Sequence, residues 1–247
     1  MSLRILVAGA AGVVGRRLTP LLLGAGHQVA GTTRSAERAD ALRAAGIAPL
    51  HVDVFDAQAL AAAVASVRPQ IVIHQLTDLP PGLDPARMAE ALAANARLRE
   101  VGTRNLVAAA RAAGSRRLIA QSIAWVYAPG PHPLTEAAPL DLGRQGPGAV
   151  SIRGVAALED AVLNAAPNVA PLEGIVLRYG RFYGPGTGVD APPAALPLHV
   201  DAAAYAALLA VERGRPGIYN LVEPNGEVAT DKAAAELGWN AAFRLPV

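Results

Sequence analysis

A glycine-rich stretch near the N-terminus, GAAGVVG at residues 9–15, constrains the fold of this chain more than any other feature. It follows an apolar run typical of a β-strand and precedes a helical pattern that extends to Leu23. In a strand-to-helix turn, Gly9 permits the tight turn, Gly12 lets the backbone approach a diphosphate, and Gly15 lets the helix pack closely on the strand. The free N–H groups of the helix N-terminus then attract the phosphates. The predicted dinucleotide-binding residues of this turn are Gly9, Ala11, Gly12, Val13, Val14 and Gly15.

Short apolar runs alternate with longer alanine- and leucine-rich segments over the first 180 residues. This alternation predicts an α/β fold of the Rossmann type, with a doubly wound parallel sheet and helices on both faces. The predicted strands are 3–8, 28–33, 48–52, 71–75, 117–121 and 174–178, and the predicted helices include 36–45, 57–67, 85–113 and 155–165.

Proline and glycine become frequent after Gly180, and the regular alternation of strands and helices ends there. A helix at 201–213, a short strand at 218–221 and a last helix at 230–237 are predicted beyond this point. We therefore expect a dinucleotide-binding domain at 1–180 and a small C-terminal substrate-binding lobe at 181–247, packed together as one compact unit.

Composition excludes several classes of function. The chain has no cysteine, which rules out disulfides, thiolate catalysis and cysteine-ligated metal sites, and no histidine–carboxylate grouping has metal-site spacing. The 22 basic and 20 acidic residues are interspersed, so nucleic acid is not an expected partner. No apolar run is long enough for a membrane span, and we expect no signal peptide, because the strand pattern begins at Leu3 without a separate charged and apolar leader. These features predict a cytoplasmic protein with a small-molecule substrate.

The end of the second predicted strand bears on the choice of dinucleotide. Proteins that bind NAD place an acidic residue there to contact the ribose hydroxyls. This chain instead has Thr33, Arg34 and Ser35 at that point, with no acidic side chain. A guanidinium group suits the additional 2′-phosphate of NADP, and the two hydroxyls add hydrogen-bonding groups. We predict NADP as the cofactor, with NAD as the alternative.

Several further stretches carry a family resemblance. They are Asp53-Val54, VIHQLT at 72–77, SIAWVY at 122–127, LRYGRFYGPG at 177–186, HVD at 199–201 and GIYNL at 217–221. Together with the glycine turn, they resemble the extended short-chain dehydrogenase/reductase family of NAD(P)-dependent epimerases, dehydratases and reductases. The resemblance implies cofactor contacts from Asp53, Val54, Gln75, Leu76 and Thr77. It also implies a possible homodimer formed through the 86–113 and 155–165 helices.

The chain departs from this family at its catalytic pair. Family members use Tyr-x-x-x-Lys on one helix, where the lysine lowers the pKa of the phenol and the tyrosine exchanges a proton with the substrate. None of the five tyrosines here has a lysine four residues later, and Lys232 is the only lysine of the chain. Alignment on Glu159 puts Ser151 and Val155 at the two positions of the pair, and Ile123 falls where a catalytic hydroxyl is usual.

Other side chains are therefore candidates for the chemistry. Tyr127 and Ser122 are the predicted catalytic residues, because both lie at the carboxyl end of the fifth strand. Tyr183 and Arg181 are the predicted substrate contacts, and the segment between Gly186 and His199 is short for a lid over a nucleotide-sugar.

Three functions remain open from the sequence. The first is NADPH-linked reduction of a small carbonyl or enone by an atypical short-chain dehydrogenase. The second is a catalytically inactive NADP(H) sensor, and the third is an epimerase or dehydratase with displaced catalytic residues.

Overall fold

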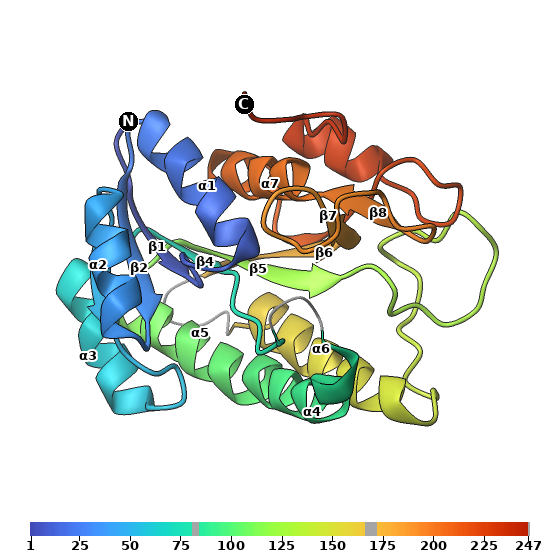
Figure 1. The fold of residues 1–247 in the computed structure, drawn as a ribbon, viewed down its shortest axis with the longest axis horizontal. Coiled ribbons are helices and arrows are strands. Elements are labelled where there is room, and N and C mark those ends of the chain that lie inside the picture. Colours follow the sequence, from blue (N-terminus) through green and yellow to red (C-terminus); the bar gives the residue numbers. More distant parts are fainter. Residues whose placement is uncertain (81–83, 166–171, 247) are drawn as a thin grey trace.

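The molecule is built around a seven-stranded sheet whose paired strands all run parallel (Figure 1). A computed structural model describes residues 1–80, 84–165 and 172–246. Its main-sheet strands are β1 Arg4–Ala8, β2 Gln28–Thr33, β3 Ala48–His51, β4 Ile71–His74, β5 Arg117–Ile123, β6 Glu173–Tyr179 and β9 Gly217–Leu221. Their order, β3-β2-β1-β4-β5-β6-β9, reverses direction between β1 and β4. This order confirms the predicted Rossmann-type doubly wound sheet.

Helices cover both faces of the sheet (Figure 1). They are α1 Val13–Gly24, α2 Ala36–Ala44, α3 Ala57–Val67, α4 Met88–Arg97, α5 Thr103–Ala112, α6 Pro147–Leu163 and α7 Val200–Glu212. Alternate residues of β1 feed two separate cores, since Ile5 and Val7 pack with α1 and α7 whereas Leu6 and Ala8 pack with α3, α5 and α6. Both faces of each central strand are therefore apolar, as a fully buried parallel sheet requires.

The predicted long helix at 85–113 is interrupted in the structure. A short 3-10 turn, η2 Pro85–Arg87, leads into α4, and a π-helical turn, η3 Leu98–Gly102, separates α4 from α5. A β-carbon on Gly102 would lie 2.9 Å from Leu98 Cδ1 and 3.2 Å from Val54 Cγ2, so this turn packs tightly at the glycine. The predicted helical stretch has the expected extent, from Pro85 to Ala112, but the apolar pattern does not reveal the π-helical turn within it.

Two other predicted boundaries shift. Strand β5 continues to Ile123, two residues beyond the predicted end, and α6 begins at Pro147 rather than near Val155. Proline at the first helical position is favourable because its missing N–H has no partner there in any case. A short parallel pair, β7 Arg181–Tyr183 with β8 Pro197–His199, was not predicted.

Part of the predicted C-terminal lobe is integrated into the main body. Strand β9 is an edge strand of the sheet, and α7 packs against α1. An ion pair between Arg17 Nε and Asp201 Oδ1, 2.5 Å apart, joins these two helices, and Trp239 Nε1 donates to the Ala202 carbonyl. The functional division at residue 180 stays a prediction. In the described part of the chain no helix is long and apolar enough to cross a membrane.

Gly174 offers a test of the close packing between β6 and α6. A β-carbon there would lie 2.2 Å from the Val162 carbonyl oxygen, so Gly174→Ala forces the backbones apart. We expect a loss of about 1–3 kcal/mol in the free energy of unfolding, measured by urea denaturation. The control is Gly24→Ala at the end of α1, where a β-carbon meets no atom within 4 Å. An equal effect of both substitutions would contradict the packing described.

Candidate functional site

The glycine turn has the geometry of a diphosphate-binding turn. Gly9 has φ +92°, and a β-carbon there would lie 2.7 Å from the backbone carbonyl of Gln75. A β-carbon on Gly15 would lie 2.2 Å from the Gly9 carbonyl oxygen, so α1 begins directly against the turn. Gly12 is the N-cap of α1 and gives it no side-chain cap. The first N–H groups of α1 therefore have no side-chain acceptor at the cap and can bind an anion.

The segment after β2 leaves one of its three predicted cofactor side chains exposed. Thr33 Oγ1 accepts a hydrogen bond from Ser35 N at 3.1 Å, and Ser35 caps α2 by accepting from Arg38 N at 3.3 Å. Both hydroxyls therefore have local partners, whereas the Arg34 side chain is exposed. Arg38, also exposed on the first turn of α2, is a second cationic candidate that the sequence analysis missed.

The other predicted cofactor residues lie at the same carboxyl edge of the sheet, after β3 and β4. Asp53 Oδ1 accepts from Phe55 N at 2.9 Å, and the Val54 carbonyl accepts from Asn105 at 2.9 Å, which fixes that loop. Gln75 is buried and its Nε2 donates to the Tyr179 hydroxyl at 3.3 Å, but its Oε1 has no hydrogen-bond partner in the described chain. Leu76 is half-buried and Thr77 is exposed beside it. These contacts fix the backbone of both loops.

Ser122 belongs to a buried ionic network. Its hydroxyl donates to Glu159 Oε1 at 2.8 Å, and the Arg178 guanidinium donates to both oxygens of the same carboxylate, at 2.8 and 2.6 Å. All three residues are less than 5% exposed. Glu159 thus joins α6 to β5 and β6, and Ser122 has a structural role in this network. The catalytic role predicted for Ser122 stays a prediction.

Tyr127 lies next to that network. Its hydroxyl donates to Asn220 Oδ1, and the Arg178 guanidinium lies 4.8 Å from its ring centroid. Burial raises the pKa of the Tyr127 phenol, although Arg178 and Asn220 oppose the effect, so the phenol keeps its proton at neutral pH. A neutral phenol can act as a proton donor only when its hydrogen bond to Asn220 is exchanged for one to the substrate. Its predicted catalytic role also stays a prediction.

Two charged or titratable groups that the sequence analysis did not assign lie nearby. Burial, together with the charge of Arg99, lowers the pKa of His74 to about 4, and the His74 ring is 2.9 Å from the Thr103 hydroxyl. Arg99 on η3 is only 6% exposed, and burial lowers its pKa to about 10 while Glu159 opposes that shift. A charged residue within the apolar pattern of a helix was the only sequence signal for Arg99.

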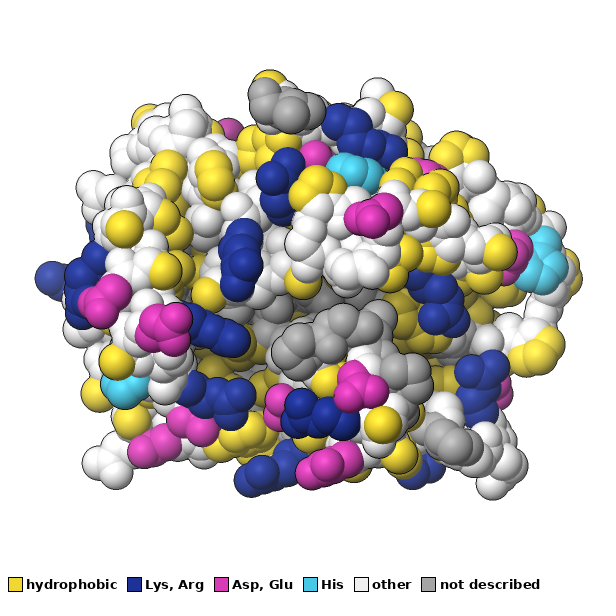
Figure 2. Space-filling view, in the orientation of Figure 1, with side chains coloured by type: hydrophobic (Ala, Val, Ile, Leu, Met, Phe, Trp, Pro, Cys, Tyr) yellow, Lys and Arg dark blue, Asp and Glu magenta, His cyan; other side chains and the backbone are white. Residues whose placement is uncertain are grey.

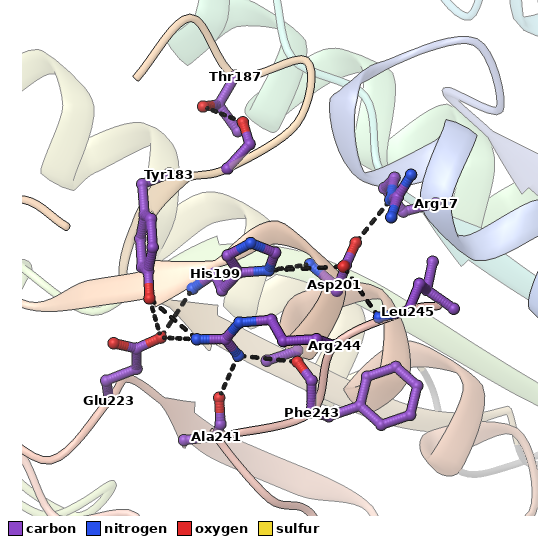
Figure 3. Close-up of polar contacts among 12 residues, drawn as sticks. Arg17, Tyr183, Thr187, His199, Asp201, Glu223, Ala241, Phe243, Arg244 and Leu245 are labelled. Carbon is purple, nitrogen blue, oxygen red and sulfur yellow. Dashed lines mark hydrogen bonds and ion pairs between the residues drawn. The ribbon is translucent and has the colours of Figure 1, made fainter. Parts of the chain in front are cut away.

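Both predicted substrate residues, Arg181 and Tyr183, lie on β7. Arg181 is exposed, with its guanidinium 4.6 Å from the ring centroid of Trp125, which sequence analysis had not assigned. The Tyr183 hydroxyl donates to Glu223 at 2.7 Å and accepts from Arg244 at 3.0 Å (Figure 3). The structure therefore separates the two: Arg181 stacks on an aromatic ring, and Tyr183 belongs to a polar cluster with the C-terminal segment.

That cluster extends to α1. The Asp201 carboxylate accepts from Arg17 and, at 3.0 Å, from Leu245 N, and the His199 ring accepts from Asp201 N at 3.2 Å (Figure 3).

Elsewhere, acidic and basic side chains are interspersed on the face shown in Figure 2. Among the described residues, no group of three or more histidine, aspartate or glutamate side chains could hold a metal ion.

The two α6 residues that the alignment on Glu159 assigns to the family's catalytic pair hold no ionisable side chain. Val155 is fully buried, and Ser151, one turn earlier, is half-buried. The only lysine, Lys232, donates from Nζ to the Ile218 carbonyl at 2.8 Å and lies 4.5 Å from the Tyr219 ring centroid. Lys232 therefore contacts β9, the edge strand of the sheet.

Comparisons with known proteins agree with this architecture. The model of the NAD dependent epimerase/dehydratase family matches residues 5–211. A Streptomyces protein named 3-diazoavenalumate denitrifying reductase is 43% identical over 248 residues, covering 90% of this chain and 76% of its own. The chain therefore belongs to the NAD dependent epimerase/dehydratase family, as its motifs predicted.

Solved structures show the same fold. UDP-glucose 4-epimerase from Thermotoga maritima, solved with UDP-glucose, is 18% identical with a TM-score of 0.78, covering 98% of this chain and 94% of its own. WbmG from Bordetella bronchiseptica, solved with NAD, is 22% identical with a TM-score of 0.70, covering 99% and 91%. At these identities the likeness concerns the fold alone.

The Arg17–Asp201 pair predicts a pH-dependent contribution to stability. Burial raises the pKa of Asp201, but Arg17, the Leu245 N–H and His199 outweigh that effect, and its pKa lies below the ordinary value. The contribution is therefore present above the unfolded pKa, about 3.9, and is lost as the pH falls through the lower folded pKa. We expect Asp201→Asn to lower the free energy of unfolding at pH 7 by about 1.5–3 kcal/mol.

Urea denaturation from pH 7 to pH 2.5 checks this expectation. The difference between the wild type and Asp201→Asn should shrink in the acidic part of the range. Asp190→Asn, at an exposed position, is the control and should change little at any pH. A difference for Asp201→Asn that stays constant down to pH 2.5 would show that the carboxylate charge contributes nothing.

Proposed function

We propose that the chain is an NADPH-dependent reductase of small, electron-poor substrates. One combination of features carries the proposal: the diphosphate-binding turn is intact, whereas α6 has no tyrosine–lysine pair. Hydride transfer needs a bound nicotinamide and an aligned acceptor, and a proton donor is added only where the product requires one. The reductase name of the 43% identical relative supports the same reaction type.

The proposed cofactor site uses residues of this chain in three groups. The turn at 9–15 binds the diphosphate, Arg34 with Thr33 and Ser35 contacts the adenosine 2′-phosphate, and the loops at 53–54 and 75–77 flank the rest of the dinucleotide. The cofactor, when bound, supplies the hydride. NADP is preferred in this proposal because no acidic side chain follows β2, and NAD remains the alternative, since family structures were solved with it.

The proposed substrate side lies at the carboxyl end of β5. Trp125 and Arg181 present an aromatic ring and a stacked guanidinium there, and both suit a planar substrate. Tyr127 is the proposed proton donor for carbonyl and enone substrates. Ser122 is proposed as a positioning residue, because its hydroxyl donates to Glu159. Tyr183 is also proposed to contact the substrate, and its hydrogen bonds to Glu223 and Arg244 hold it in place.

A second candidate reaction is reductive loss of nitrogen from an aryl diazo compound, favoured by the identity to the Streptomyces reductase. In this reaction a hydride adds to the terminal nitrogen of an arenediazonium ion, the C–N bond then breaks, N₂ leaves, and the ring carbon gains hydrogen. The cofactor is oxidised to NADP⁺ and the atoms balance without an external acid. An active site that lacks the usual proton relay is compatible with such chemistry.

The non-catalytic sensor remains the alternative to both reactions. A sensor binds NADPH but consumes none when it is assayed with aldehydes, ketones, enones and arenediazonium salts.

We also propose that the protein is cytoplasmic, with a small-molecule substrate and without nucleic-acid or membrane partners. A homodimer through α4–α5 and α6 is also proposed, and analytical ultracentrifugation tests it.

Cofactor selection is tested at Arg34. We expect Arg34→Ala to weaken NADP⁺ binding about 10–100-fold, because a charge-assisted hydrogen bond to phosphate is lost, and to leave NAD⁺ binding unchanged. Isothermal titration with each nucleotide measures this. Arg43→Ala, whose side chain pairs with Asp40 at the far end of α2, is the control. Equal weakening of both nucleotides by Arg34→Ala would remove the NADP assignment.

Tyr127→Phe separates the two candidate reactions. Loss of a general acid costs about 10²–10⁴ in rate, so carbonyl and enone reduction should fall by that factor while NADPH affinity stays unchanged. Denitrification of an arenediazonium salt should keep its rate, because no alkoxide forms. NADPH consumption under single-turnover conditions measures both. An equal loss with both substrate classes would point to a structural role of the Tyr127–Asn220 hydrogen bond.

A further inference from the structure

Arg99 is a buried cation without an ion-pair partner among the described residues. The residue is only 6% exposed, and no carboxylate of residues 1–80, 84–165 or 172–246 forms an ion pair with its guanidinium. It lies on η3, the π-helical turn between α4 and α5, and π-turns often occur at functional sites. A buried guanidinium needs an anionic or polar partner, because its desolvation is otherwise costly.

The charges around Arg99 do not balance. Glu159 is the carboxylate whose charge acts on Arg99, but both of its oxygens accept hydrogen bonds from Arg178. His74 is neutral near pH 7, because burial lowers its pKa to about 4. The group therefore contains two guanidinium groups and one carboxylate, which leaves an excess of one positive charge. A bound anion would compensate that charge.

Arg99 also lies beside the part of α6 that lacks the lysine. Helix α4 meets α6 at Ala96 and Gly154, where a β-carbon on Gly154 would lie 2.9 Å from Ala96 Cα (Figure 1). Arg99 follows one turn later, and η3 also packs against α6. Side chains on a helix point toward its N-terminus, and here that end faces the carboxyl edge of the sheet. By this geometry we expect the Arg99 guanidinium to point toward the carboxyl edge, where open α/β sheets bind their ligands.

We propose that Arg99 binds an anionic oxygen of the substrate, either an aryl oxide or the oxyanion that forms during hydride addition. The inference rests on the proposed reductase function. The carbonyl carbon gains the hydride, the π electron pair moves to oxygen, and NADPH becomes NADP⁺. Arg99 donates N–H groups to that oxygen until Tyr127 or water supplies the proton. A preorganised cation in a buried site stabilises such a charge strongly.

The test uses 4-nitrophenol as the probe, because its phenolate absorbs visible light and reports its own ionisation. The probe is titrated into the wild-type complex with NADP⁺ and into the Arg99→Gln complex. We expect Arg99→Gln to weaken phenolate binding about 10–100-fold, as for the loss of a charge-assisted hydrogen bond. Arg99→Lys should restore part of the affinity, and Arg104→Gln, at an exposed arginine of α5, should change nothing.

Two measurements keep the outcomes distinct. NADP⁺ affinity of each variant is measured first by isothermal titration, and parallel losses of NADP⁺ and phenolate in Arg99→Gln would make Arg99 a cofactor ligand and overturn the proposal. In the wild type alone, 4-nitroanisole, the neutral analogue, should bind at least about tenfold more weakly than the phenolate. Equal binding of the two probes overturns the proposal even if Arg99→Gln fails to fold. A wild-type protein that binds no nucleotide instead overturns the proposed function itself.

Discussion

The site depends on the hydrogen bonds that the buried Glu159 carboxylate accepts. It accepts hydrogen bonds from Ser122 on β5 and from Arg178 on β6, and it projects from α6. One buried group thereby fixes the helix that faces the substrate side to the two strands that end there. Removing it would leave two cations uncompensated inside the protein, which typically costs several kcal/mol. The network holds α6 in position against the sheet without a tyrosine–lysine pair on that helix.

The sequence was sufficient for the fold because the fold follows from local patterns. Strand β1, the glycine turn and α1 were predictable from apolar periodicity and three glycines, and Gly9 and Gly15 have the tight contacts that this motif requires. The π-turn η3 and the β7–β8 pair were not predictable. Both depend on tertiary packing and leave no period in the sequence.

The site divides in the same way. The predicted cofactor residues lie in contiguous motifs that sequence reasoning can recognise, whereas the ionic network joins residues 37 and 19 positions apart. Ser122 illustrates the limit, since its position at a strand end suggested chemistry and its hydrogen bond leads into the protein core. Arg99 shows the converse. Its only sequence signal was a charge within an apolar helical pattern, and its burial separates it from the exposed arginines of the same helices.

The absent lysine and the buried arginine are two parts of one electrostatic arrangement. A lysine at the Val155 position would place a third cation one turn from Glu159, in addition to Arg99 and Arg178, and like charges in a buried site destabilise one another. Retaining Arg99 is therefore compatible with losing that lysine. The guanidinium cannot pass on a proton at neutral pH, whereas a lysine can lower the pKa of a tyrosine for proton exchange. A site with a buried arginine and without a lysine therefore favours reactions driven by hydride addition and charge stabilisation. It is less suited to reactions that require reversible proton transfer.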